Sequence, residues 1–218
     1  MNLNDIKNNK EICALIDKGN ENLKVLGYTE HSQIHCSVVA KRAEDILEKL
    51  GYSKEMSTLA SIAGFMHDIG NSVNRSNHAE YGGLLAYELL KELNMPLEDR
   101  ITVMAAIGNH DESTGGAKDV VSAALIIADK TDVRRSRVQE KIKANFDIHD
   151  RVNYAVTNNE LKIDKDSKSI VLELELDETI CTMYEYFDIF LGRMLMCREA
   201  AQMLGMKFKL QANGSKIL

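Results

Sequence analysis

The sequence predicts a mainly α-helical bundle that carries a small C-terminal antiparallel β meander and a long closing helix. The chain of 218 residues contains one proline and is rich in residues that favour helices. Up to about residue 150, apolar side chains recur at spacings of three and four, whereas beyond residue 151 they alternate. We therefore expect a helical unit over residues 1–150 and an appendage over residues 151–218 that packs on it.

The helices can be placed in order from their caps and apolar spacing. Val39, Ala43 and Ile46 share one face of a helix over 32–50, and Gly51 ends it as a C-terminal glycine usually does. The segment 119–132 is apolar all round, which predicts a buried central helix. The other expected helices cover residues 5–17, 20–26, 54–67, 78–93 and 97–108.

Beyond residue 151 the alternation predicts three short antiparallel strands. The expected strands cover residues 152–156, 161–163 and 170–176, with tight turns at Asn158-Asn159 and Lys165–Lys168. A helix over 178–204 and a short strand over 207–210 complete the chain. An open sheet of this kind leaves edges that need covering, so the appendage either caps the helical unit or forms a homodimer contact.

Composition excludes several classes of protein. The chain has 27 Lys and Arg against 33 Asp and Glu, a formal net charge of −6, which disfavours a nucleic acid polymer as partner. No apolar run is long enough to span a membrane, and the first residues lack the features of a signal peptide. The four cysteines form no C-x-x-C pair and are expected to be reduced thiols. We therefore expect a cytoplasmic protein.

Polar side chains within the apolar stripes identify candidate metal ligands. His35 shares the face of Val39, and His67 and Asp68 end an apolar helix. Asp129 follows the most apolar segment, where a buried carboxylate is costly unless a cation offsets it. Imidazole and carboxylate groups together suit Zn, Fe, Mn or Co ions. His35, His67, Asp68 and Asp129 are therefore candidate ligands of one ion.

Two further histidines stand at helix ends and could complete a second site. His78 begins a helix and His110 follows one. These two could hold a second ion, with Asp68 bridging the pair. Each residue also has a purely structural interpretation, as a hydrogen-bonded core histidine or a helix-capping aspartate. His149 is assigned to that interpretation, and so is His31, although His31 would approach the site if its helix began early.

The order of these residues resembles the HD superfamily of metal-dependent phosphohydrolases. The resemblance covers roughly residues 28–138 and rests on His35, the stretch His67-Asp68-Ile69-Gly70, and Asp129. It implies a helical bundle in which His35, His67, Asp68 and Asp129 form the first metal site. His78 and His110 match the additional histidines of two-metal branches, which include bacterial diadenosine tetraphosphate hydrolases and HD-GYP phosphodiesterases. The Gly-Tyr-Pro motif is absent, which argues against cyclic-di-GMP as substrate, and Asn71 stands where many relatives have lysine.

Basic residues near Asp129 are candidate phosphate ligands. If the helix continues past Asp129, Lys130 and Arg134 lie on one face close to the metal, and Arg75 is a weaker candidate. The alternative is a solvated basic face paired with Glu140 and Asp132. The closing helix and the meander show no residues that indicate chemistry.

These observations predict a metal-dependent phosphohydrolase that uses one or two divalent ions, Fe, Mn, Co, Ni, Zn or Mg, with Fe or Mn favoured. Asp68, Lys130 and Arg134 are the expected catalytic residues, and the substrate is a nucleotide or another small phosphorylated metabolite. Two alternatives share the same ligands: a diiron oxygenase and a non-catalytic nucleotide-binding sensor.

Overall fold

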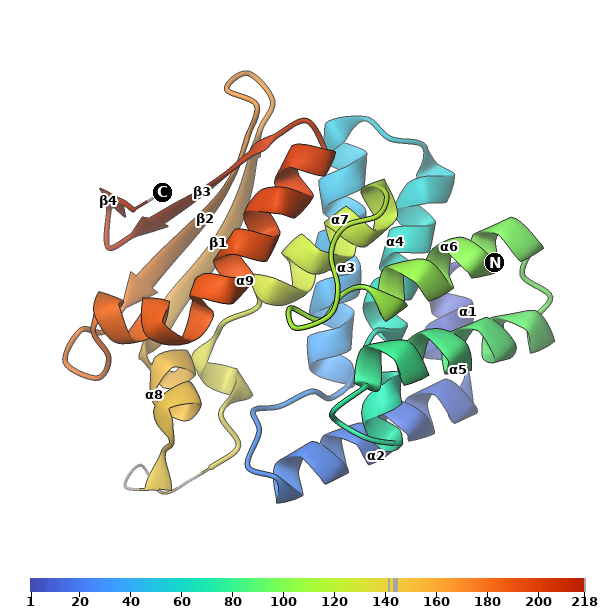
Figure 1. The fold of residues 1–218 in the computed structure, drawn as a ribbon, viewed down its shortest axis with the longest axis horizontal. Helices are drawn as coiled ribbons and strands as arrows, with labels where there is room; N and C mark the ends of the chain where they lie inside the picture. The colour runs from blue at the N-terminus through green and yellow to red at the C-terminus, as the bar shows by residue number, and fades with distance from the viewer. Residues whose placement is uncertain (141, 143–144, 218) are drawn as a thin grey trace.

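In the computed structural model, which describes residues 1–140, 142 and 145–217, helices surround one buried helix, α7 (Figure 1). The first part of the chain forms α1 (Leu3–Lys7), α2 (Lys10–Val25), α3 (Gln33–Leu50), α4 (Lys54–Met66), α5 (His78–Glu92), α6 (Leu97–Gly108) and α7 (Val120–Lys130). Two short 3-10 helices, η1 (Ile69–Ser72) and η2 (Arg135–Arg137), follow α4 and α7. The predicted helical character is therefore confirmed.

Local capping residues explain where these helices begin and end. The Ser32 side chain accepts from the backbone N–H of Ile34 at the start of α3, and Gly51 ends α3 with a φ of 89°. Asp119 and Ser122 form a reciprocal capping box at the start of α7. Every residue from Val121 to Ala128 is buried, and α7 packs against α3, α4 and α9, as expected of a helix that is apolar all round.

The predicted break between two opening helices, over 5–17 and 20–26, is wrong. Residues 10–25 form the single helix α2, which continues through Gly19. Gly19 is buried where α2 contacts η1, and an added Cβ would lie 3.1 Å from the Cβ of Asn71. The glycine that would usually weaken a helix here allows close packing of α2 against the segment after α4.

The predicted antiparallel meander needs correction. The C-terminal part forms α8 (Ile148–Ala155), β1 (Val156–Asp164), β2 (Ser169–Leu176), α9 (Met183–Met203), β3 (Lys207–Ala212) and β4 (Ser215–Lys216). The sheet order is β1-β2-β3-β4, and β3 pairs parallel with β2, while the other two pairs are antiparallel. The sheet is therefore mixed, with α9 as the crossover between its parallel strands.

The strand predicted over residues 152–156 is wrong. These residues lie mostly in α8, which Asp147 caps, and the buried Val152 and Ala155 point to one side of it. Asn158 and Asn159 lie inside β1 rather than in a turn. The turn at Lys165–Lys168 is present, and Lys168 has a φ of 47°.

The core is continuous across residue 150. One cluster of buried side chains includes Ile126 of α7, Cys197 of α9 and Leu172 of β2. Figure 1 shows α9 lying between the sheet and α7, with its two sides facing different layers. All four cysteines are free thiols, and Cys13 alone of the four is partly exposed.

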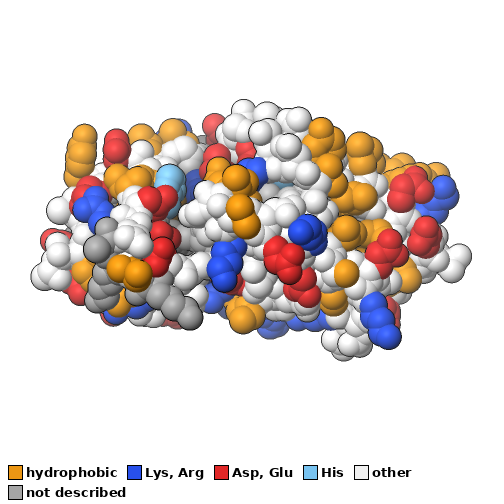
Figure 2. All heavy atoms as spheres, turned by 90° about the horizontal axis from the view of Figure 1, so that it is seen from below, with side chains coloured by type: hydrophobic (Ala, Val, Ile, Leu, Met, Phe, Trp, Pro, Cys, Tyr) orange, Lys and Arg blue, Asp and Glu red, His pale blue; other side chains and the backbone are white. Residues whose placement is uncertain are grey.

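The surface seen in Figure 2 mixes acidic, basic and apolar side chains. Among the described residues, no helix combines the length and the apolar character that crossing a membrane requires.

Candidate metal centre

Three helices that pack on one another bring four of the predicted ligands together. His35 lies in the first turn of α3 on its buried face, His67 and Asp68 follow α4, and Asp129 lies near the end of α7. The two histidines are at most 1% exposed and the Asp68 carboxylate is 4% exposed. Asp129 is 12% exposed, so the cluster opens to solvent on the side of α7.

The facing atoms of these residues are close to one another. His67 Nε2 lies 3.1 Å from Asp68 Oδ2 and 3.6 Å from Asp129 Oδ1. His35 Nε2 lies 3.4 Å from Asp129 Oδ1 and 3.7 Å from Asp68 Oδ2. Ligand atoms bound about 2.1 Å from an ion at tetrahedral angles lie about 3.4 Å apart, so these separations suit a first-row divalent ion.

Unsatisfied polar atoms at the same point support this fit. His35 Nε2 and Asp68 Oδ2 are buried and have no hydrogen-bond partner among the described residues. Buried polar atoms are rarely left without a partner, because each one costs about 1–3 kcal/mol. A divalent cation would satisfy both atoms at once, so His35, His67, Asp68 and Asp129 could hold a metal ion.

All four buried histidines of the site are oriented in the same way. In each ring Nδ1 faces an oxygen acceptor, and in the neutral ring donation from Nδ1 leaves Nε2 with a lone pair directed at the site. The acceptors are Asp132 Oδ2 for His35 (2.8 Å) and the carbonyl oxygens of Gly64 for His67 (2.9 Å), Arg75 for His78 (3.0 Å) and Ile107 for His110 (2.7 Å).

His78 and His110 form a second group of acceptors beside the first. Their Nε2 atoms lie 3.2 Å apart, and His78 Nε2 is 3.9 Å from Asp68 Oδ1. Because Asp68 Oδ2 faces His35 and His67, the two oxygens of this carboxylate point at different groups. Asn71 donates to Asp68 Oδ1 at 2.8 Å and so fixes that carboxylate. The arrangement permits two ions with Asp68 between them.

Gly70 allows the second group to approach the first. A Cβ on Gly70 would collide with the carbonyl oxygen of His78 and the backbone nitrogen of Gly82, because α5 lies against the backbone of η1. The absence of a side chain therefore brings His78 beside Asp68.

The electrostatics differ between the two groups of acceptors. Burial lowers the pKa of His67, but the Asp68 and Asp129 carboxylates outweigh it and raise that pKa to about 10. Burial also lowers the pKa of His110, and the neighbouring His67 and Lys130 lower it further, to about 3. The carboxylates of Asp68 and Asp129 have pKa values well below the usual range despite their burial, because the positive charges of neighbouring His67 and Lys130 stabilise the ionised form.

Of the two basic residues predicted beside Asp129, the structure brings one to the site. The buried Lys130 Nζ lies 2.9 Å from Asp129 Oδ2 and 2.6 Å from Glu112 Oε2. The helix ends at Lys130, so the expected shared face with Arg134 does not exist. Arg134 donates from Nε to Asp132 at 2.8 Å and does not line the cavity beside the histidines.

Asp132 is a positioning residue that the sequence analysis did not single out. Its carboxylate orients His35 and also accepts from Arg134. Burial alone would raise its pKa, but the hydrogen bond from His35 and the charge of Arg137 hold that pKa well below its usual range. Its place three residues after Asp129 is the one signal that could have identified it.

Two neighbouring cavities that share lining residues lie beside the candidate ligands. The inner cavity, of about 30 Å³, is lined by Asp68, His78, His110 and Asp129 together with basic groups. The outer cavity, of about 260 Å³, is lined by residues of the α2–α3 connection, α8 and α9. Four residues line both cavities and mark the boundary between them: Thr29, His31, Arg75 and Arg193.

Sequence reasoning missed two charged residues of this region, Glu112 and Arg193. Glu112 follows His110 by two residues, and no local pattern distinguished it. Arg193 is brought to the site by the packing of α9, which sequence spacing does not reveal. His31, assigned to a structural role, lies at the boundary of the cavities, with its ring 5.5 Å from that of His35.

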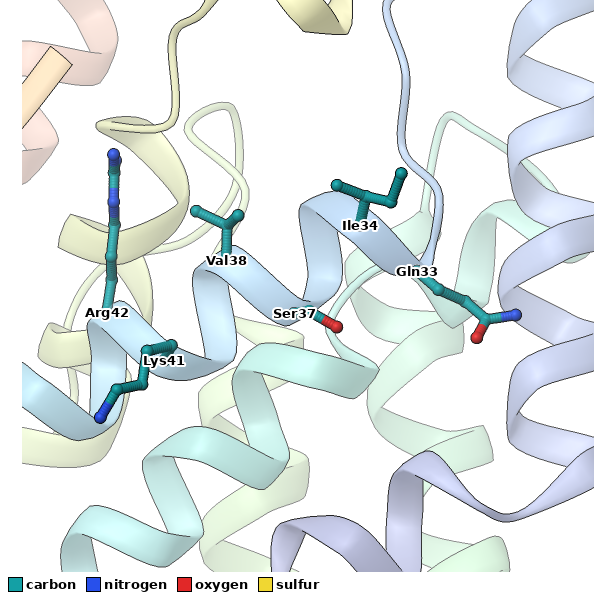
Figure 3. A pocket seen from close by; sticks show the side chains of 6 residues that line it. All are labelled: Gln33, Ile34, Ser37, Val38, Lys41 and Arg42. Atoms are coloured by element: carbon teal, nitrogen blue, oxygen red, sulfur yellow. The ribbon is translucent and has the colours of Figure 1, made fainter.

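A separate shallow depression lies on the outer side of α3 (Figure 3). Ile34, Val38 and Arg42 project from successive turns to the same side of the helix. This depression shares no lining residue with the two cavities.

Residues 33–151 match the family model of the HD domain. The match covers more than half of the chain, and the chain therefore belongs to the HD domain family. It is 26% identical over 173 residues to an uncharacterised protein of Methanocaldococcus jannaschii; the match covers 69% of this chain and 66% of that relative. The chain thus spans slightly less than two thirds of the relative's length.

Among solved structures, the chain is similar to a predicted HD superfamily hydrolase from an uncultured Thermotogales bacterium. The two are 23% identical with a TM-score of 0.45, over 62% of this chain and 75% of that one.

Proposed function

We propose that this chain is a metal-dependent phosphohydrolase that cleaves a phosphate ester or anhydride of a nucleotide or another small phosphorylated metabolite. One observation carries the proposal: buried imidazole and carboxylate groups direct their lone pairs at one small cavity that basic side chains also line. Membership of the HD domain family agrees with this chemistry.

The ligand roles follow from the two groups of acceptors. His35, His67, Asp68 and Asp129 would hold one divalent ion, and His78 and His110 would hold a second with Asp68 between them. Mixed imidazole and carboxylate ligands suit Fe, Mn, Co or Zn, of which we favour Fe or Mn. When bound, such an ion polarises a phosphoryl oxygen and lowers the pKa of a water molecule.

The protein's own charges prepare the inner cavity for an anion. Among the described residues its lining has four basic side chains, Arg75, Lys130, Arg137 and Arg193, and three acidic ones, Asp68, Glu112 and Asp129. The cavity is thus formally positive, even before a cation binds, in a chain of net charge −6. The ammonium of Lys130, fixed between Asp129 and Glu112, neutralises charge that develops on phosphoryl oxygens.

The size of the cavities defines the class of substrate. The inner cavity of about 30 Å³ has room for only a small polar group, and the outer one of about 260 Å³ is the size of a small organic group. We therefore propose small phosphorylated molecules as substrates, rather than a nucleic acid polymer.

The test is metal analysis of the purified protein, followed by a phosphatase screen over mono- and polyphosphate nucleotides. Substitution Asp68→Ala removes the carboxylate that faces both groups of acceptors, so we expect loss of bound metal and of turnover. The matched control is Asp166→Ala, in an exposed turn of the sheet, which should retain both. Unchanged metal content in Asp68→Ala would defeat the assignment.

The same measurements separate this proposal from the two alternatives that use the same ligands. Purified protein that contains about two irons and is inert toward every phosphate ester tested would favour the oxygenase over the hydrolase. Nucleotide binding without turnover in added Mn²⁺, Co²⁺ or Fe²⁺ would indicate a sensor.

A further inference from the structure

We propose that Arg193 of α9, together with Arg75, binds the phosphate of the substrate at the boundary between the inner and outer cavities. This inference rests on the proposed function and deepens it, because it assigns a substrate-binding role to a helix outside the matched HD domain. The leaving group of the substrate then lies in the outer cavity, between the α2–α3 connection and helices α8 and α9.

The position of the two arginines supports this role. Among the four residues that line both cavities, Arg75 and Arg193 are the two with a permanent positive charge. Thr29 is uncharged, and the ring of His31 lies with Nδ1 2.6 Å from the carbonyl oxygen of Thr29. Where the two cavities adjoin, the lining therefore carries two guanidinium groups.

Each guanidinium group is fixed by one polar contact and one aromatic ring. Arg193 donates from Nε to Glu112 Oε1 at 3.1 Å, and its Cζ lies 4.6 Å from the centre of the Phe190 ring. Arg75 Cζ lies 5.2 Å from the centre of the Tyr28 ring, and its Nη1 lies 3.3 Å from Asn71 Oδ1. Stacking on aromatic rings removes water from one face of each group and limits its motion, which strengthens binding of an anion.

Arg193 retains donors for a ligand. Nε is the one nitrogen of this side chain that makes a hydrogen bond to a described residue, and the side chain is 28% exposed. The terminal nitrogens of a guanidinium form a fork that matches two phosphate oxygens. Glu112 also accepts from Lys130, so this single carboxylate fixes one cation beside Asp129 and another at the boundary of the cavities.

Arg193 is the better of the two arginines to test. Arg75 Nη1 lies 3.3 Å from His78 Nε2, so its substitution would also disturb a proposed metal ligand. Arg193 contacts Glu112 and Phe190 and makes no hydrogen bond to any histidine among the described residues. Arg198, an exposed arginine on the same helix, is the matched control.

The experiment measures the dissociation constant of inorganic phosphate by calorimetry on protein loaded with Mn²⁺, and metal content by mass spectrometry. Loss of hydrogen bonds to a charged group corresponds to a ten- to hundred-fold weakening, so Arg193→Met should raise this dissociation constant at least about ten-fold. Metal content should be unchanged, Arg193→Lys should recover part of the affinity, and Arg198→Met should bind as the unsubstituted protein does.

The outcomes are distinguishable. Equal phosphate affinity in Arg193→Met and the unsubstituted protein would overturn the inference, and so would the absence of phosphate binding to the loaded protein. Loss of metal in both Arg193→Met and Arg193→Lys would assign the residue a structural role and also overturn it. Phosphate binding that depends on Arg193 without hydrolysis of any ester would support the anion site while the proposed function fails.

Discussion

Glu112 is the residue that connects the candidate metal centre to the C-terminal helix. Its two carboxylate oxygens accept from Lys130 of α7 and Arg193 of α9. Burial alone would raise the pKa of Glu112, but the positive charges of Lys130 and Arg193 outweigh this effect and lower the pKa to about 2.

This shift predicts how stability depends on pH. The pKa of Glu112 is lower in the folded protein than its ordinary value of 4.5, so its stabilising contribution is present above pH 4.5. The contribution is lost as the pH falls from 4.5 towards 2, because the unfolded chain then binds a proton that the folded protein does not. Glu112→Gln should therefore be less stable than the unsubstituted protein at pH 7, by a margin that narrows below pH 4.5.

Urea unfolding at several pH values between 7 and 3 measures this margin. Glu199→Gln, an exposed substitution on α9, is the control and should show little difference at any of these pH values. A margin for Glu112→Gln that stays constant with pH would contradict the assigned charge pairing.

Single residues also show what sequence spacing can and cannot predict. The order of His35, His67, Asp68 and Asp129 was visible because each polar group interrupts an apolar stripe, and the structure places all four together. Their metal-binding roles stay predictions until metal is measured. Arg193 could not be predicted, because nothing near it in sequence indicates that α9 reaches the cavity.

At the scale of elements, strand β1 holds the turn that follows α7. Asn159 Nδ2 donates to the carbonyl oxygens of Thr131 (2.7 Å) and Val133 (2.9 Å), and its Oδ1 accepts from Arg42 of α3. This turn leads from Asp129 to Asp132, so a residue of the sheet fixes the backbone on which two site carboxylates stand.

Substitution Asn159→Ala should lower the free energy of unfolding by about 1–3 kcal/mol, because it removes three hydrogen bonds and takes from the Val133 carbonyl its donor, while Arg42 and Thr131 keep the bond between them. Denaturant unfolding measures the change. Asn158→Ala is the matched control, since Asn158 is the exposed neighbour in the same strand and should change stability much less. An equal decrease in the free energy of unfolding in the two variants would show that the hydrogen bonds of Asn159 contribute nothing to stability.

Elements differ in how far local sequence determines them. The ends of α3 and α7 follow from a serine cap, an aspartate cap and a glycine, and were predicted to within two residues. Val152, Tyr154 and Val156 alternate as in a strand, yet the Asp147 cap and the packing of Val152 and Ala155 favour helix α8. The parallel pairing of β2 with β3 depends on where α9 crosses, which is a tertiary outcome.

At the scale of the whole molecule, the helical part and the C-terminal part share one core. Buried α7 packs against α3 and α4 of the helical part and against α9 of the C-terminal part. If either part unfolded alone, apolar side chains of α7 would become exposed to water, which is unfavourable. We expect one cooperative unfolding transition for the full chain.

Circular dichroism and tyrosine fluorescence test this expectation, since the chain has seven tyrosines and no tryptophan. The two signals should give coincident midpoints in denaturant. Two separated transitions would show that the parts unfold independently, as two autonomous units would.

The boundary between the two cavities has a consequence for how such a protein can diversify. One side of it comes from the segment that contains Arg75, within the family domain, and the other from α9, beyond that domain. On the proposed function, substitutions on α9 that keep Arg193 would alter which molecules the outer cavity admits, while the candidate metal ligands stay unchanged. Arg193 itself is not free to vary in this way, because Glu112 links it to Lys130 beside Asp129.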